Sequence, residues 1–65
     1  MKSYKRNEYL KCPHCNNELT EGVAGDYAIL SGWNSGNVSE EECYECDKTF
    51  YTQYNKNTDM VDVTK

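Results

Sequence analysis

The pattern of apolar and polar positions predicts strands at the C-terminal end of the chain. Residues 49–54 (Thr-Phe-Tyr-Thr-Gln-Tyr) are rich in β-branched and aromatic side chains, which favour strands. Residues 59–64 alternate between polar and apolar positions with the two-residue period of a half-buried strand. Residues 55–58 between them have the composition of a turn. The sequence therefore predicts a C-terminal β-hairpin.

The rest of the chain shows no sustained helical periodicity, so the whole chain is predicted to be all-β. Residues 8–11 have the pattern of a short strand that leads into a pair of cysteines. All four glycines fall between Gly22 and Gly36, which predicts loops or a hairpin there. Within this stretch, residues 26–30 (Asp-Tyr-Ala-Ile-Leu) are the best candidate for a strand.

The chain is too poor in aliphatic side chains to fold around a hydrophobic core alone. It has 65 residues, and its hydrophobic fraction of 37% includes six Tyr and four Cys. Chains of this size form at most one domain and usually need a disulfide or a metal for stability. We expect residues 1–9 to be a basic N-terminal arm or first strand. Residues 10–65 are then a single domain with a glycine-rich insert at residues 20–38.

No targeting or membrane segment is expected. Residues 1–6 are basic, but no apolar segment follows them as in a secretory signal. No apolar run reaches the roughly 18 residues of a membrane span. A cytoplasmic protein is therefore predicted, and in a reducing cytosol paired cysteines bind metal more often than they form disulfides. The abundance of Lys, Asn and Tyr, which have AT-rich codons, favours a low-GC bacterium or a bacteriophage, in which case the location is the host cytoplasm.

Four cysteines in two Cys-x-x-Cys pairs are the strongest chemical signal. Each such turn brings two sulfurs together, and four soft thiolates in a tetrahedron suit Zn(II). Asn16 and Asp47 directly follow the two pairs, and these residue types tolerate the left-handed conformation that commonly follows a metal-binding Cys-x-x-Cys turn. His14 is interpreted as a solvent-facing residue, because four cysteines already complete the site. One Zn²⁺ per chain is predicted on these ligands: Cys12, Cys15, Cys43 and Cys46.

The segments Cys12-Pro-His-Cys-Asn16 and Cys43-Tyr-Glu-Cys-Asp-Lys-Thr-Phe50 resemble the two knuckles of the zinc-ribbon superfamily. In that superfamily the second knuckle runs into a β-hairpin. The resemblance covers residues 10–64 and implies a small metal-stabilised all-β domain, a zinc ribbon. Members usually have Gly where this chain has Asn16 and Asp47. Because zinc ribbons occur in transcription factors, polymerase subunits, ribosomal proteins and small adaptors, the resemblance implies a fold and a structural metal but no single activity.

The expected function is that of a protein-binding adaptor or regulator. A closed four-thiolate site has no open position for water or substrate, and the lone His leaves no nucleophile pair, so an enzyme is not expected. The superfamily resemblance favours a role in transcription or other nucleic-acid machinery. A protein partner is expected, with a monomer favoured. Trp33 is expected to fold back over the small core instead of serving as an exposed anchor.

Two alternative functions remain open. The first is direct nucleic-acid binding through basic residues 1–11, where Tyr4 and Tyr9 alternate with Lys and Arg, although the formal net charge of −4 disfavours it. The second is a rubredoxin-like iron electron carrier, because rubredoxins are small, acidic and built on two Cys-x-x-Cys knuckles. Tetrahedral sulfur ligation alone does not separate Fe from Zn. The aromatic cluster of such a protein has these candidates: Tyr27, Trp33, Tyr44 and Phe50.

A thiol oxidase is a weaker third interpretation of the first cysteine pair. The Cys-Pro-His-Cys segment that starts at Cys12 matches the active-site motif of the periplasmic thiol oxidase. That chemistry needs the first cysteine at a helix N-terminus within a βαβ scaffold, which lowers its pKa. The sequence predicts no such helix, and a thiol oxidase leaves the second pair unexplained.

Overall fold

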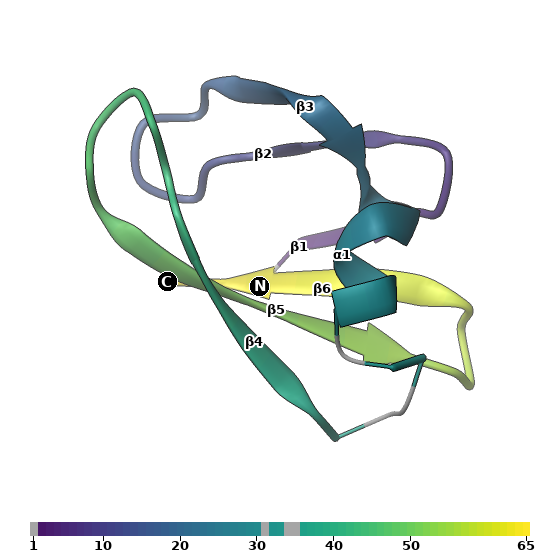
Figure 1. Cartoon of the computed structure of the whole chain (residues 1–65). Helices are drawn as coiled ribbons and strands as arrows, with labels where there is room; N and C mark the ends of the chain where they lie inside the picture. Colours follow the sequence, from purple (N-terminus) through teal and green to yellow (C-terminus); the bar gives the residue numbers. More distant parts are fainter. Residues whose placement is uncertain (1, 31, 34–35) are drawn as a thin grey trace.

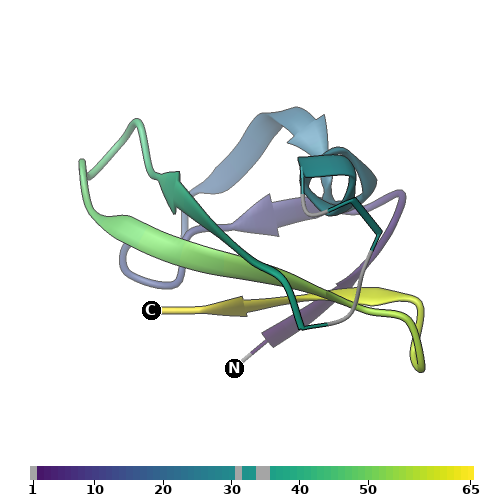
Figure 2. The ribbon, with the colours of Figure 1, turned by 60° about the horizontal axis from the view of Figure 1, so that its bottom comes forward.

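The chain folds into two antiparallel sheets and one short helix (Figure 1). The computed structural model describes residues 2–30, 32–33 and 36–65. The elements in chain order are β1 (Lys2–Lys5), β2 (Tyr9–Lys11), β3 (Glu18–Val23), α1 (Ala24–Leu30), β4 (Val38–Glu42), β5 (Thr49–Asn55) and β6 (Met60–Thr64). One sheet has the strand order β1-β6-β5-β4, and the other consists of β2 and β3. The small sheet and the helix lie over one face of the larger sheet (Figures 1 and 2).

The predicted C-terminal hairpin is present. Strands β5 and β6 pair antiparallel, with Thr52 opposite Val63 and Tyr54 opposite Val61. Burial alternates along both strands, so that these four residues and Phe50 face the core. The hydroxyl of Thr52 is buried without a hydrogen-bond partner among the described residues. The strands predicted at residues 49–54 and 59–64 are therefore confirmed as β5 and β6.

The predicted strand at residues 26–30 is wrong, because this segment lies in helix α1, and the all-β prediction is corrected to mostly β. The Asp26 carboxylate caps the helix by accepting a hydrogen bond from the Val23 N–H at 3.0 Å. Two further N–H groups at the helix start, those of Ala24 and Gly25, bond to backbone carbonyls in the β1–β2 connection at 2.7 and 2.8 Å. The start of this helix is therefore held mainly by hydrogen bonds to residues that are distant in the sequence.

Gly25 lies where the helix backbone packs closely against the β1–β2 connection. A Cβ at this position meets the Arg6 carbonyl oxygen at 3.1 Å, which is tighter than ordinary contact. Ala24 and Ala28 are also buried, so small residues line the inner face of the helix. Ile29 and Leu30 point outward and are 58% and 64% exposed. The helix thus packs by close backbone approach and through the half-buried Tyr27, while Ile29 and Leu30 stay at the surface.

The basic N-terminal residues form a paired strand. Strand β1 runs antiparallel to β6, with Lys2 opposite Val63 and Lys5 opposite Met60. Tyr4 points inward and is 7% exposed, whereas Lys2 and Lys5 are exposed. Because its ring is buried, Tyr4 is not available to stack on a nucleotide base.

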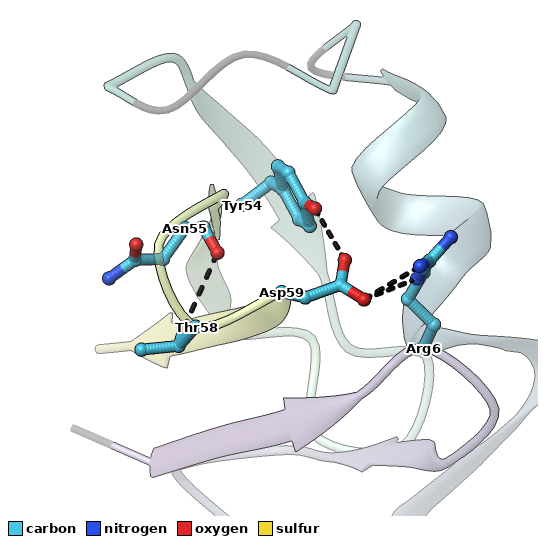
Figure 3. Close-up of polar contacts among 5 residues, drawn as sticks. All are labelled: Arg6, Tyr54, Asn55, Thr58 and Asp59. Atoms are coloured by element: carbon cyan, nitrogen blue, oxygen red, sulfur yellow. Dashed lines mark hydrogen bonds and ion pairs between the residues drawn. The ribbon is translucent and has the colours of Figure 1, made fainter.

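Trp33 packs against Tyr54 at the end of the sheet where β5 turns into β6. The two rings meet edge to face, with centroids 5.1 Å apart, and the Arg6 guanidinium lies 5.4 Å from the Trp33 ring. Arg6 also pairs with Asp59 at 2.6 Å, and the Tyr54 hydroxyl donates to the other Asp59 oxygen at 2.5 Å (Figure 3). This cluster joins the β1–β2 and β5–β6 connections. Trp33 folds back against Tyr54, but its side chain stays 38% exposed, so the expectation that it folds back over the core instead of being exposed is met only in part. Ser31, Asn34 and Ser35 of the same loop lie outside the described residues.

The aromatic cluster expected of a rubredoxin-like protein is not assembled among the described residues. Phe50 is fully buried, but Tyr44 is 48% exposed. Trp33 makes its ring contact with Tyr54, which was not one of the candidates. The core instead joins aliphatic and aromatic side chains to two of the cysteines, since Leu10, Phe50, Val61, Cys12 and Cys43 are all at most 1% exposed.

Candidate metal centre

The first Cys-x-x-Cys pair forms the connection between β2 and β3. The Cys12 N–H donates to the Asn17 carbonyl at 2.9 Å, and the Asn16 N–H donates back to the Cys12 carbonyl at 2.8 Å. The His14 N–H points at the Cys12 sulfur from 3.4 Å. Asn16 has a φ of 63°, in the left-handed region. These bonds fold residues 12–17 into a tight turn, here called the first knuckle.

The second pair forms the same structure between β4 and β5. The Cys43 N–H donates to the Lys48 carbonyl at 3.0 Å, and the Asp47 N–H donates to the Cys43 carbonyl at 2.8 Å. Asp47 has a φ of 59°. We call residues 43–48 the second knuckle. The expectation that Asn16 and Asp47 adopt left-handed conformations is confirmed at both positions.

The two knuckles bring all four predicted cysteines together, with every sulfur within 4.8 Å of the others. The sulfurs of Cys12 and Cys46 are 3.7 Å apart, and so are those of Cys15 and Cys43. All four thiols are free, and 3.7 Å is far longer than a disulfide bond of about 2.05 Å. A tetrahedral site with Zn–S bonds of about 2.3 Å has S···S edges of about 3.8 Å. The sulfur arrangement therefore fits one tetrahedral metal ion.

The two halves of the site are related by an approximate twofold arrangement. Each close sulfur contact joins the first cysteine of one knuckle to the second cysteine of the other. Cys12 and Cys43, the first cysteines, are buried; Cys15 is exposed and Cys46 is half-buried. A metal bound here is covered on its inner side by the core and lies near the surface on its outer side.

One side chain from each knuckle contacts the first residue of the strand that follows the other knuckle. The His14 ring lies with its Nε2 2.8 Å from the Thr49 carbonyl, so Nε2 carries the proton and donates. The Tyr44 hydroxyl lies 3.5 Å from the Glu18 carbonyl, a longer contact. Glu18 and Thr49 are the first residues of β3 and β5, so the two ties are equivalent. His14 lies outside the sulfur cluster, as expected, but it is bonded across the site instead of simply facing solvent.

The electrostatics of the thiols are unequal before a metal binds. Burial acts to raise the pKa of the Cys12 thiol, but hydrogen bonds from the backbone N–H groups of Cys15 and His14 outweigh it and lower this pKa to about 6. At Cys46 a backbone hydrogen bond from Lys48 acts to lower the pKa, but burial and the neighbouring sulfurs raise it to about 12. Four adjacent thiolates repel one another, so a cation is required before all four ionise.

Comparisons with known protein families, curated proteins and solved structures find no match for this chain. Its class is therefore defined by its own geometry, as a small, mostly β domain with a four-cysteine site suited to a metal ion. Within the described residues, no helix has the length and apolar character needed to cross a membrane.

Proposed function

We propose that Cys12, Cys15, Cys43 and Cys46 hold one structural Zn(II) ion and that the chain is a zinc-ribbon-like domain. The observation that carries this proposal is the group of four sulfurs at the tips of two hairpins with matching backbone geometry. Four protein ligands fill a tetrahedral site and leave no position for a substrate, which is typical of structural zinc. Such binding supplies on the order of 10–16 kcal/mol in zinc peptides at neutral pH, which compensates for the small apolar core.

Zinc is favoured over iron because the aromatic cluster expected of a rubredoxin-like iron protein is not assembled among the described residues. Tyr44, the aromatic residue inside the second knuckle, is 48% exposed. Trp33 packs against Tyr54 in the cluster at the β5–β6 turn instead of covering the cysteines. The sulfur set itself accepts either metal, because tetrahedral thiolate ligation suits both.

The experiment on metal identity is to express the protein with zinc and iron both supplied and to measure metal content and absorption. We expect about one zinc per chain and a colourless protein. Stoichiometric iron with a red colour contradicts the structural-zinc proposal and supports an electron carrier. A protein that purifies without metal and with oxidised thiols contradicts both.

We further propose that the domain acts as an adaptor that binds a protein partner through strand β4. This strand is an edge of the larger sheet, and among the described residues it pairs only with β5. An edge strand presents backbone N–H and C=O groups to which an extended segment can add. Val38, Glu40 and Glu42 are exposed on the outer face of β4. The charge of this edge favours a partner segment that is basic and extended, and transcription or other nucleic-acid machinery is the setting proposed for it.

The test of this surface uses an alternating Lys-Val peptide and amide NMR on the zinc-loaded protein. We expect shifts confined to β4 and its neighbour β5, with slower amide exchange on β4. The E40K/E42K variant is expected to lose this binding. The matched control is E18K/E21K, which changes the charge equally on exposed positions of β3. Equal loss in both variants contradicts a β4 site and indicates general charge attraction.

A further inference from the structure

A basic groove lies beside the first knuckle. It has a volume of about 620 Å³, and its charged lining residues are Lys2, Lys11 and Lys65. No Asp or Glu side chain lines it. This composition is unusual for a chain with 11 acidic and seven basic residues. We call this cavity the lysine groove.

The fold gathers these lysines from three separate segments. Because β1 pairs antiparallel with β6, Lys2 lies opposite Val63. The start of β1 and the end of β6 therefore lie together at one end of the sheet (Figures 1 and 2). Lys11 is the last residue of β2, directly before the first knuckle, and Lys65 follows β6. The convergence is therefore a product of the topology and does not follow from residues 1–11 alone.

The three ammonium groups are available to a ligand. Across residues 2–30, 32–33 and 36–65, none of them lies within 4.0 Å of a carboxylate oxygen in an ion pair. By contrast, Arg6 is held by Asp59 at 2.6 Å at the other end of β1. Glu18 lies directly across the β2–β3 pair from Lys11, but the two side chains form no ion pair. Lysines that converge without ion pairs create a positive potential that attracts anions.

An exposed aromatic ring adjoins the lysine groove. A second cavity of about 430 Å³ shares Lys2 and Lys11 with it and is also lined by Tyr9, whose side chain is 44% exposed. Tyr9 and Lys11 lie on the same face of β2, because Leu10 between them points into the core. Two carboxylates, those of Glu8 and Glu18, line this second cavity, so a phosphate fits better in the lysine groove and an uncharged base fits beside Tyr9.

We propose that the lysine groove and Tyr9 form a binding site for single-stranded nucleic acid. Lys2, Lys11 and Lys65 contact backbone phosphates, and a base stacks on the Tyr9 ring, the combination that sequence-tolerant single-strand binders use. The stacking ring favours a nucleic-acid strand over an acidic peptide, which needs only the charges. This site goes beyond the adaptor role and does not depend on it. Tyr4 also lines the groove, but its ring is buried and is not proposed to stack, and the paired Arg6 lies outside the site.

Cys12, one of the four cysteines, is also among the residues that line the groove. With a divalent ion on four thiolates, the metal centre carries about two negative charges. The competing hypothesis is therefore that the lysines balance the charge of the metal centre instead of binding a nucleic acid. The two roles differ in what removal of the lysines changes: oligonucleotide affinity in one case and metal affinity in the other.

The experiment measures binding of a fluorescent oligothymidylate of about 10 nucleotides to the zinc-loaded protein as a function of salt. We expect binding that weakens as salt rises. In K2Q/K11Q the affinity at low salt falls roughly tenfold or more, and the salt slope decreases by about 1.4, or about 0.7 per lost phosphate contact on a single strand. The matched control K5Q/K48Q removes two exposed lysines outside the groove and is expected to change affinity less than threefold.

A Tyr9→Ser variant separates stacking from charge. We expect roughly fivefold or greater loss of oligonucleotide affinity with an unchanged salt slope, because the ring contributes no charge. Inorganic phosphate and polyglutamate are used as competitors. Displacement by either one as effectively as by unlabelled oligonucleotide contradicts a nucleic-acid site and indicates a general anion or acidic-peptide site.

Three further outcomes overturn the proposal. The first is that the native protein does not bind the oligonucleotide, and the second is an equal loss of affinity in K2Q/K11Q and K5Q/K48Q. The third is that K2Q/K11Q loses zinc affinity while the native protein shows no salt-dependent oligonucleotide binding. The last outcome assigns the lysines to the metal centre. Zinc content and amide NMR dispersion of every variant are recorded, so that misfolding is distinguished from a lost contact.

Discussion

The two knuckles share one backbone geometry but lie in opposite electrostatic surroundings. In both, the residue after the second cysteine is left-handed and donates to the carbonyl of the first cysteine at 2.8 Å. The first knuckle adjoins the lysine groove, whereas the second follows the acidic strand β4 and carries Glu45 and Asp47. The turn backbone therefore determines where the sulfurs lie, while the flanking strands determine the charge on each side of the domain.

The largest effect is expected from loss of a ligand. Because each knuckle contributes a buried first cysteine, Cys12→Ser and Cys43→Ser are expected to abolish tight zinc binding and to unfold the domain to a similar extent. Zinc affinity and circular dichroism measure both variants. A variant that keeps full zinc affinity and fold with three cysteines contradicts a four-ligand site, and unequal losses show that one knuckle dominates.

A smaller effect is expected where the knuckles need a left-handed residue. Ala at position 16 or 47 is expected to be less stable than the native Asn or Asp, because Ala lacks the short polar side chain that bonds locally at positive φ, and about 1–2 kcal/mol less stable than Gly, which has no Cβ. The matched Gly variants are expected to be neutral or stabilising, since Gly adopts this conformation without strain. Denaturant titration of the zinc-loaded proteins measures all four. An Ala variant as stable as its Gly counterpart contradicts the assigned turn geometry.

The ties between the knuckles are expected to be unequal. His14→Ala removes the 2.8 Å hydrogen bond to the Thr49 carbonyl and is expected to lower stability by about 1 kcal/mol. Tyr44→Phe removes a contact at 3.5 Å and is expected to cost less. Thermal unfolding of the two zinc-loaded variants ranks them. A larger loss of stability for Tyr44→Phe than for His14→Ala contradicts this order and shows that the Tyr44 contact is stronger than its distance indicates.

The smallest effect is expected at the other end of the sheet, far from both knuckles (Figure 1). The hydrogen bond to Asp59 is the main cause that raises the pKa of Tyr54 above its ordinary value of 10. A raised folded-state pKa means that this contribution to stability is complete below pH 10 and is lost as the pH rises through the higher value. In Asp59→Asn, tyrosinate absorbance is expected to show this titration moving back towards pH 10, with Tyr54→Phe as the control. An unchanged titration contradicts the contact.

The parts of the fold that the sequence predicts correctly have local signals. The Cys-x-x-Cys spacing and the residue types at Asn16 and Asp47 are enough to anticipate both knuckles, because a turn of this length leaves the chain few conformations. The strand-forming residues at 49–54, the turn composition of residues 55–58 and the alternation along residues 59–64 are likewise local, and together they predict the C-terminal hairpin. The sequence also predicts that the four cysteines share one site, because a chain with so little apolar surface needs all four of them to bind a stabilising metal ion.

The parts that the sequence does not reveal depend on distant backbone groups. Helix α1 begins where the N–H groups of Ala24 and Gly25 meet carbonyls of the β1–β2 connection, and no residue type signals such a meeting. Strand β4 contains three consecutive Glu residues, which have low strand propensity, and it forms because it pairs with β5 along its whole length. The acceptors of His14 and Tyr44 are backbone carbonyls, so the ties between the knuckles have no sequence signature.

We propose that one metal ion on four thiolates holds this fold together. The most direct measurement is a zinc titration of the reduced, metal-free protein, followed by amide NMR. We predict narrow dispersion without zinc and native dispersion that grows in slow exchange and is complete at one zinc per chain, with Cys12 and Cys46 neighbours among the amides that shift most. Native dispersion in the metal-free protein, or an endpoint other than one zinc per chain, contradicts the claim.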